Sequence, residues 1–170
     1  KEMYENGELK KIFDDKGNLT KTVIEKYYDS VSGTIVGAKS QIGQYGTTLL
    51  FTLNSDGVDF CFQVRYDSSY GRSILMRLPN IDTDEVVYFS PYNFESKDDF
   101  KNGKPKKIVG VTIKQFDNKI NPFWTKENPK ELPEWEKTTV AGQDKWNTDK
   151  QNEYLHDFFI EWSNRFTDEA

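Results

Sequence analysis

Two apolar runs with the period of a β-strand lie near the middle of the chain, at 47–53 and 58–66. In the second run apolar and polar side chains alternate, with Phe60, Phe62, Val64 and Tyr66 on one face and Asp59, Cys61, Gln63 and Arg65 on the other. Asp56-Gly57 between the runs favours a tight hairpin turn, because glycine readily adopts a positive φ. The period of two predicts that the aromatic face is buried and that the polar face is free to bind.

Similar patterns predict the elements around this hairpin. Further strands are expected at 34–39, 85–90 and 107–116. A short helix is expected at 70–78, because Asp67, Ser68 and Ser69 can cap it and Pro79-Asn80 ends it. A glycine-bearing loop at 40–46 and a polar excursion at 91–105 separate the strands.

The predicted element order is three strands, a short helix and two more strands. This is the element order of the OB-fold, a five-stranded Greek-key barrel. We therefore predict a mainly β protein with an OB-like five-stranded barrel over about 33–116, with the helix between strands three and four. In an OB-fold two loops flank the ligand groove, and here they would be 40–46 and 91–106. A different small barrel has the same element order and stays an alternative.

The two ends of the chain give weaker patterns. In the N-terminal extension, 1–32, a turn at 14–18 lies between apolar residues, which fits a hairpin or a short helix; we favour extended structure. Residues 117–170 begin with an irregular connection at 121–146, which contains three prolines and the aromatic residues Phe123, Trp124, Trp135 and Trp146. We expect the whole chain, 1–170, to form one domain.

An amphipathic C-terminal helix should follow this connection. Asn147 or Thr148 can cap it, and Thr148 with Gln151 matches a capping box. Its apolar stripe consists of Leu155, Phe158, Phe159, Trp162 and Phe166. A stripe this apolar must be covered, either by the barrel wall or by a second subunit.

The net charge is −5 and is unevenly spread along the 170 residues. Residues 100–119 carry six lysines and one aspartate, whereas residues 120–170 carry six basic and eleven acidic side chains. The acidic total argues against a histone-like binder, but a local positive groove remains compatible with it. The lysine block fits a solvated loop equally well.

The residue types for catalysis are sparse, and we expect no enzyme, no cofactor and no metal. His156 is the only histidine and fits a structural role, while Cys61 is the only cysteine and excludes an intrachain disulfide. The acidic groups at 82–85 and 98–99 lack the spacing of an EF-hand and fit solvated turns. The chain contains no apolar run long enough to span a membrane, and nothing at its N-terminus resembles a secretory leader, so we expect a cytoplasmic protein.

A nucleic-acid site is the better interpretation. Single strands are held by a positive groove and by exposed rings on which bases stack, each stack contributing roughly 1–3 kcal/mol. The candidate cations are Lys39, Arg65, Lys104, Lys106, Lys107 and Lys114, and the candidate stacking residues are Tyr45, Tyr70, Tyr92 and Phe94. Arg72 and Arg77 rank lower, because the helix of an OB barrel lies far from the groove.

Three stretches carry a family resemblance: GAKSQIGQYGTTLLFTL, SYGRSILMRLPNID and VVYFSPYNFE with KPKKIVGVTIKQ. They resemble the single-stranded DNA-binding proteins of the OB-fold class, particularly divergent phage-type ones, over about half of the chain. The resemblance implies binding of single-stranded DNA without sequence preference, in replication or recombination and beside the proteins of those processes, in the host cytoplasm if the source is viral. The glycine-rich, acidic-tipped tail of bacterial members is not found, and segment 121–146 has no counterpart in them.

Two other functions stay open at this point. An acidic, aromatic-rich β-domain also suits a carbohydrate-binding or other extracellular module. A structural or assembly protein could use the C-terminal stripe to form a homodimer.

Overall fold

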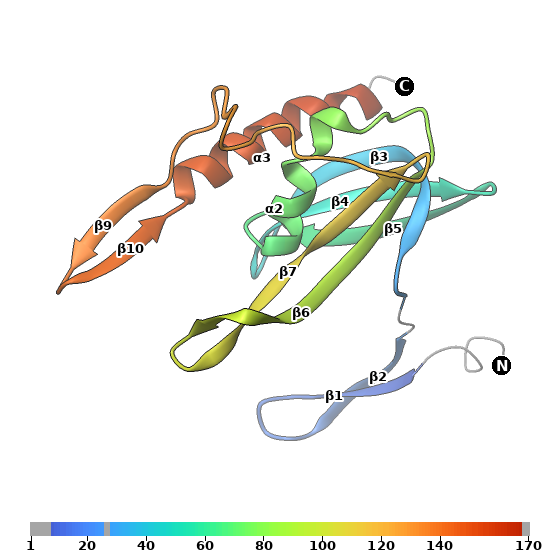
Figure 1. Ribbon diagram of the computed structural model, residues 1–170. Coiled ribbons are helices and arrows are strands. Elements are labelled where there is room, and N and C mark those ends of the chain that lie inside the picture. The colour runs from blue at the N-terminus through green and yellow to red at the C-terminus, as the bar shows by residue number, and fades with distance from the viewer. Residues whose placement is uncertain (1–7, 26–27, 168–170) are drawn as a thin grey trace.

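The computed structural model describes residues 8–25 and 28–167, which form a mainly β protein with a C-terminal helix (Figure 1). One sheet contains six strands in the order β5-β4-β3-β6-β7-β8, and every neighbouring pair is antiparallel. Its strands are β3 (Val31–Gly43), β4 (Gly46–Ser55), β5 (Val58–Arg65), β6 (Val87–Lys101), β7 (Lys104–Gln115) and β8 (Asn118–Lys119).

The long strand β3 joins the two halves of this sheet. Its first residues, Val31 to Gly33, pair with β6, whereas Thr34 to Gly43 pair with β4. Strands β3, β4 and β5 follow one another as hairpins, and β6 then returns to lie beside β3. The resulting spatial order is β6-β3-β4-β5, in which the fourth of these strands lies beside the first. This is the strand order of a Greek key.

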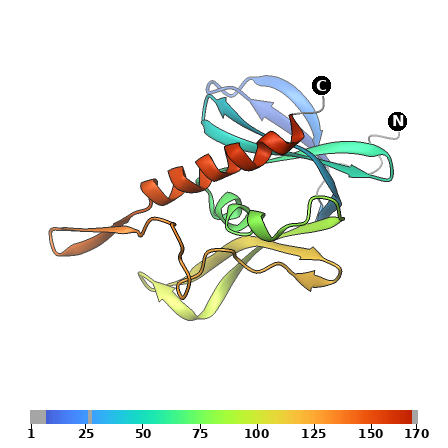
Figure 2. The same cartoon turned by 90° about the horizontal axis from the view of Figure 1, so that it is seen from above.

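The sheet is open, in contrast to the predicted closed five-stranded barrel. Among the described residues, β5 pairs only with β4, and β8 pairs only with β7. Helix α2 (Ser69–Leu75) stands between the two halves (Figure 2). Ser73 Oγ donates to Val111 O and accepts from Val111 N, so this hydroxyl takes the place of a partner strand at that point of β7.

The helix predicted at 70–78 is present and has the predicted kind of cap, but it is shorter than predicted. The Ser68 hydroxyl accepts a hydrogen bond from Gly71 N at 3.0 Å and caps the helix. The helix ends after Leu75, and a separate 3-10 turn, η1 (Leu78–Asn80), follows it. Proline at position 79 lies in that turn, where its missing N–H costs little.

The excursion predicted at 91–105 is wrong, because these residues are strand. Strand β6 runs to Lys101 and β7 starts at Lys104, so only Asn102 and Gly103 form the turn. Both have positive φ, 52° and 74°, as a type I′ turn requires. The loop predicted at 40–46 shrinks in the same way, to a two-residue turn at Gln44-Tyr45.

The N-terminal extension contains a separate hairpin, as the preferred interpretation predicted. Strands β1 (Glu8–Phe13) and β2 (Leu19–Glu25) pair only with each other among the described residues. Asp14 closes the turn. Its carboxylate accepts hydrogen bonds from Asn18 N, from the Asn18 side-chain amide and from Lys16 N, and these bonds lower the pKa of Asp14 in that order.

The segment predicted to be irregular, 121–146, includes another hairpin. Strands β9 (Glu136–Val140) and β10 (Gln143–Asn147) are joined by Ala141-Gly142, again with positive φ at both residues. Trp124 anchors the preceding stretch, since its ring is buried and lies 5.2 Å from that of Phe158. Trp135 and Trp146 remain half-exposed and lie 6.4 Å apart, ring centre to ring centre.

Helix α3 (Asp149–Ser163) covers the inner face of the sheet, followed by the 3-10 turn η2 (Asn164–Phe166). Its stripe is buried by the chain's own sheet: Phe159 lies edge-on to Phe51 of β4, with ring centres 5.5 Å apart. Phe51 also stacks on Phe62 of β5, which contacts Phe89 of β6, so these rings join both halves of the sheet.

The predicted capping box of α3 is wrong. Thr148 is the N-cap residue but makes no side-chain cap bond, and the Asn147 side chain accepts from Asp149 N instead. The Gln151 amide is buried and used elsewhere, donating to Pro133 O and accepting from the Trp135 indole N–H. The Gln151 side chain therefore bonds to the 121–135 segment and not to the helix N-terminus, where the sequence pattern placed it.

Candidate nucleic-acid interface

A row of exposed rings lies on the outward face of the β6–β7 hairpin. Tyr88, Tyr92 and Phe94 belong to this face, because side chains of residues two apart on a strand lie on the same side. The alternating residues Phe89, Val111 and Ile113 are buried in the core on the opposite side. We call the outward set, consisting of Tyr88, Tyr92, Phe94 and Ile108, the aromatic face.

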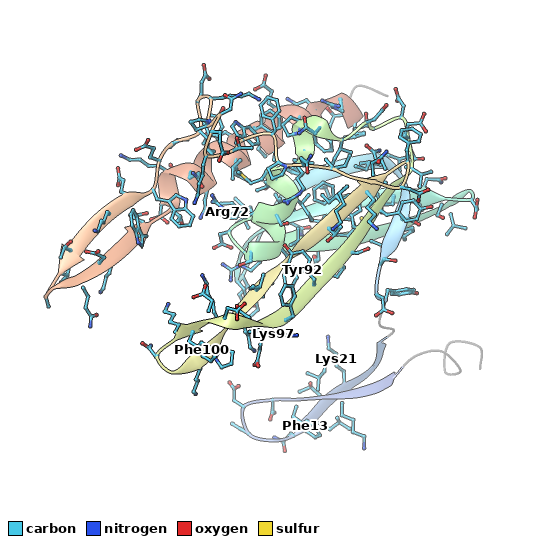
Figure 3. The ribbon with its side chains drawn as sticks, viewed as in Figure 1. Phe13, Lys21, Arg72, Tyr92, Lys97 and Phe100 are labelled. Carbon is cyan, nitrogen blue, oxygen red and sulfur yellow. The ribbon has the colours of Figure 1, made fainter. Side chains whose placement is uncertain are left out.

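The rings of the aromatic face are accessible. Tyr88 is 46% exposed and Phe94 is 53% exposed, while Tyr92 is partly buried and lies 5.9 Å from Phe94 between ring centres. Figure 3 shows Tyr92 on β6. Nucleic-acid bases stack on aromatic side chains that are exposed on a protein surface in this way.

Lysines flank the aromatic face at both ends. Lys114 pairs across the strands with Tyr88, and Lys119 on β8 lies directly beside Lys114. At the far end strand alternation places Lys106 two residues before Ile108, although Lys106 forms an ion pair with Asp99 at 3.3 Å. Within 8–25 and 28–167 neither Lys114 nor Lys119 has an ion-pair partner.

A hollow of about 480 Å³ lies beside these rings. Its lining includes Arg77, Tyr92, Phe94, Ile108 and Lys119. It therefore combines stacking surface with two cations, Arg77 from the link between α2 and η1 and Lys119 from β8.

Two predicted cations lie on the other half of the sheet. Arg65 and Lys39 are on the outward face of β3–β4–β5, opposite Phe60, Phe62 and Val64, as strand alternation predicted. Arg65 is bound by its own neighbour, because its Nε and Nη2 both donate to the Asp67 carboxylate, at 3.1 and 2.8 Å. A phosphate would have to compete with Asp67 for this guanidinium.

The remaining lysines do not form one patch. Lys107 pairs with Glu95 on the face of β7 opposite to the aromatic face. Lys104 lies at the tip of the hairpin, where it pairs with Lys101. The lysine block in the sequence is therefore divided between two faces and a tip.

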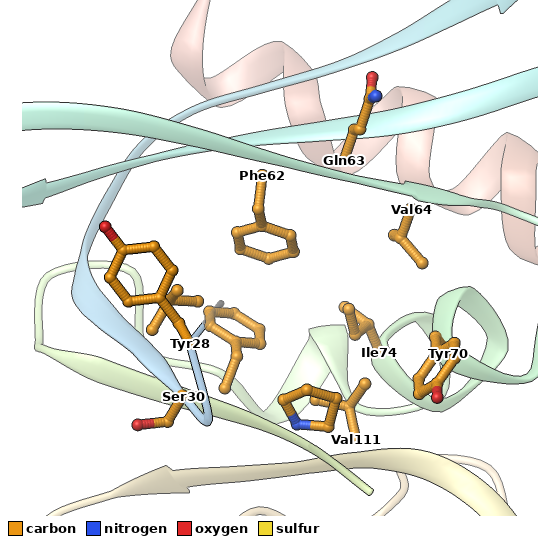
Figure 4. Close-up of a pocket in the computed structure, with 11 residues that line it drawn as sticks. Tyr28, Ser30, Phe62, Gln63, Val64, Tyr70, Ile74 and Val111 are labelled. Atoms are coloured by element: carbon orange, nitrogen blue, oxygen red, sulfur yellow. The ribbon is translucent and has the colours of Figure 1, made fainter. Parts of the chain in front are cut away.

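Two predicted stacking residues lie away from the aromatic face. Tyr45 is 82% exposed in the β3–β4 turn. Tyr70 belongs to α2 and lines an apolar cavity of about 380 Å³, with Phe62 and Val64 on one side and Val111 on the other (Figure 4). This cavity lies in the open seam between β5 and β7, and its lining, as far as the chain is described, includes no lysine or arginine for a phosphate.

Arg72 and Arg77 were ranked low from the sequence, yet the structure brings both close to exposed rings. The Arg72 guanidinium lies 5.3 Å from the ring centre of Trp135, and Arg77 lines the hollow beside Tyr92 and Phe94. Burial lowers the pKa of both arginines, with Tyr92 opposing the shift at Arg77. Only the folded contacts between α2, β7 and the 121–135 segment reveal these two positions.

Groups suited to catalysis have structural contacts. His156 Nε2 lies 2.7 Å from Ser40 Oγ, and its ring packs 5.1 Å from that of Tyr66. Across the described part of the chain, no three His, Cys, Asp or Glu side chains gather as a metal-binding group. Nor do the described residues include a helix with the length and apolar character needed to cross a membrane.

Comparisons of this chain with protein-family models, curated proteins and solved structures found no match.

Proposed function

We propose that this protein binds single-stranded DNA without sequence preference, through the aromatic face and the cations around it. The observation that carries the proposal is the row of exposed Tyr88, partly buried Tyr92 and exposed Phe94 on one sheet face, with Lys114 and Lys119 at one end. Bases of any sequence offer a ring to stack on, while lysine and arginine attract the phosphates between them.

We further propose that the sheet is an OB-like fold opened along one seam. The strand neighbours support this: β3 lies beside both β4 and β6, a helix separates β5 from β6, and β6 and β7 form a hairpin. OB-folds are partly open barrels that bind oligonucleotides with their sheet and the adjoining hairpins. In this interpretation the β6–β7 hairpin supplies the extended binding arm.

The test is the binding of a fluorescently labelled dT oligonucleotide, followed by anisotropy at low and moderate salt. Because each phosphate contact releases a counterion, we expect affinity to fall steeply as salt rises. Replacing both Tyr92 and Phe94 with alanine should weaken binding by at least about tenfold, since each stack is worth roughly 1–3 kcal/mol. Phe13→Ala is the control, because Phe13 (56% exposed) is a ring about as exposed as Phe94 and lies on the separate β1–β2 hairpin.

Absence of binding at low salt would reject the function. Binding that ignores both salt and the double substitution would reject the mechanism.

A carbohydrate-binding function ranks second and has one observation in its favour, the half-exposed pair Trp135 and Trp146. Cations already lie over these indoles, Arg72 over Trp135 and Lys137 over Trp146, so a sugar could use only the remaining ring faces. A glycan array that binds the protein while dT does not would favour this alternative.

A further inference from the structure

A second hollow, of about 400 Å³, lies between α2, β7 and the segment that follows β8. The guanidinium-bearing side chains Arg72 and Arg77 line it, together with the hydroxyls of Ser69 and Thr125 and the apolar walls of Met76 and Trp124. No described residue of this lining carries a carboxylate.

Both guanidinium groups are half-buried without a negative partner among the described residues. Arg72 Nη1 donates to the neutral Asn152 side chain at 3.3 Å. Arg77 donates to two backbone carbonyls, Ile120 O at 3.1 Å and Ser73 O at 2.8 Å. Burying charge in this way is unfavourable unless an opposite charge arrives, which is why burial lowers the pKa of both groups.

Among the described residues that line these hollows, Glu134 is the one acidic side chain, and it shares its hollow with Arg72. It lines the neighbouring hollow of about 470 Å³ with Arg72 and Trp135, is exposed, and forms none of the ion pairs of the described chain. It does not line the hollow between the two arginines.

Hydrogen-bond donors remain available for an incoming anion. A guanidinium has five N–H groups, and the hydrogen bonds above leave Nη2 of both arginines unused within 8–25 and 28–167. The Ser69 hydroxyl makes no hydrogen bond within the described chain, and Thr125 uses its oxygen only as an acceptor, from Asn128 N. Planar guanidinium forks match the geometry of phosphate oxygens.

We propose that the hollow between Arg72 and Arg77 binds a phosphate group, and that this group is a phosphodiester of the strand held by the aromatic face. The two arginines connect three adjoining hollows: Arg77 also lines the one with Tyr92 and Phe94, and Arg72 also lines the one with Trp135. A single strand would therefore run from the β6–β7 hairpin across α2 to Trp135. This path rests on the proposed function, whereas the phosphate site itself does not.

Two substitutions test the site in different ways. Arg72→Gln removes one cation, with Arg72→Lys as the variant that retains the charge. Ser69→Glu adds a carboxylate at the rim without removing any hydrogen bond of the described chain, so it guards against a folding defect in the first variant. Gln44→Glu, in the exposed β3–β4 turn, is the control for the same change of charge at a distant place.

Each variant is titrated with the labelled dT oligonucleotide and, separately, with inorganic phosphate, using tryptophan emission and the melting temperature as readouts. We expect Arg72→Gln and Ser69→Glu to weaken oligonucleotide binding by about tenfold and to reduce the salt slope by about one, while Gln44→Glu changes neither. Inorganic phosphate should raise the melting temperature of the wild-type chain and not that of these two variants.

The outcomes separate the two proposals. Phosphate stabilisation lost in the variants, with unchanged oligonucleotide affinity, would keep the anion site and overturn the strand path. Variants that bind both probes like the wild type would overturn the site itself, even if the Tyr92 and Phe94 double variant loses DNA binding as the proposed function requires. Loss of DNA binding in the arginine variant alone, with the aromatic double variant unaffected, would retain this site and reject the aromatic face.

Discussion

The side chain of Tyr92 on β6 lies across Gly110 of β7, in the space that a side chain at position 110 would occupy. The two residues are directly paired across the strands, and a Cβ at Gly110 would collide with the Tyr92 hydroxyl and lie 2.7 Å from Cζ. An aromatic ring that covers a cross-strand glycine is held flat on the sheet. Gly110 thus determines how the ring of Tyr92 is presented on the aromatic face.

Replacing Gly110 with alanine should move the Tyr92 ring and weaken DNA binding. Because the colliding atoms are at the far end of a side chain, the fold should survive with a loss of about 1–2 kcal/mol. We expect oligonucleotide affinity to fall about tenfold, by anisotropy, since a misplaced ring forfeits one stack. In a Tyr92→Ala background the same change should have almost no further effect on binding. Equal losses in both backgrounds would show that Gly110 acts independently of the ring.

Ser73→Ala should destabilise the protein by about 1–3 kcal/mol, because it leaves the N–H and C=O of Val111 without the hydroxyl that satisfies both. Urea unfolding measures the loss. Ser69→Ala, one turn earlier in α2, removes an exposed hydroxyl that has no such contact, and should change stability by less than about 0.5 kcal/mol. If the two variants unfold alike, Ser73 does not cap the edge of β7.

Gly71→Ala should destabilise the protein more than Gly110→Ala does. An added Cβ would run into the backbone oxygen of Arg65, and neither α2 nor the end of β5 can shift without disturbing the core. We expect a loss of about 3 kcal/mol in the free energy of unfolding, from denaturant titration. Gly43→Ala is the control, because its Cβ would meet only Gly46 O, at an ordinary 3.5 Å. A Gly71→Ala variant as stable as the wild type would mean that α2 is not packed this closely.

The β9–β10 hairpin should loosen in acid. Asp144 accepts hydrogen bonds from Lys137 Nζ at 2.7 Å and Thr139 Oγ1 at 2.9 Å, which lower the pKa of its carboxyl in the order Lys137, then Thr139. A carboxyl with a lowered folded pKa stabilises the fold above its unfolded pKa and loses that contribution as pH falls through the folded value. Emission from Trp146, whose ring lies 5.8 Å from Lys137 Nζ, should therefore change on acidification below the usual aspartate range.

Asp144→Asn is the control for this hairpin. It cannot titrate, so its Trp146 signal should already be shifted at neutral pH and should lack the acid step. An unchanged acid step in this variant would assign the titration to another group.

Local sequence patterns correctly indicate several strands, turns and caps of this protein. Alternation correctly placed Arg65 opposite Phe60, Phe62 and Val64, and the Ser68 cap is present. Asn102-Gly103 is the strongest kind of hairpin signal, and it lies in the middle of the stretch that we predicted as an excursion. The turn of the β9–β10 hairpin, Ala141-Gly142, contains only the glycine of that signal. The sequence therefore indicates this hairpin less clearly.

The candidate site was predicted less well, because it depends on contacts between distant parts of the chain. The sequence does not show that Asp67 binds Arg65, nor that Arg72 lies over Trp135, sixty-three positions away. It also does not show that the pairing of β6 with β7 shifts register between Glu95 and Phe100.

By itself the sequence determined that the chain is mainly β with an amphipathic C-terminal helix, because side-chain periods of two and of 3.6 follow from local backbone geometry. Only the tertiary structure decided that the sheet stays open around α2 and that the helix stripe is covered by the chain's own Phe51. It alone also placed Arg72 and Arg77 together in one hollow without a carboxylate from the described residues. Burial and charge compensation depend on which segments meet in space, and no local pattern carries that information.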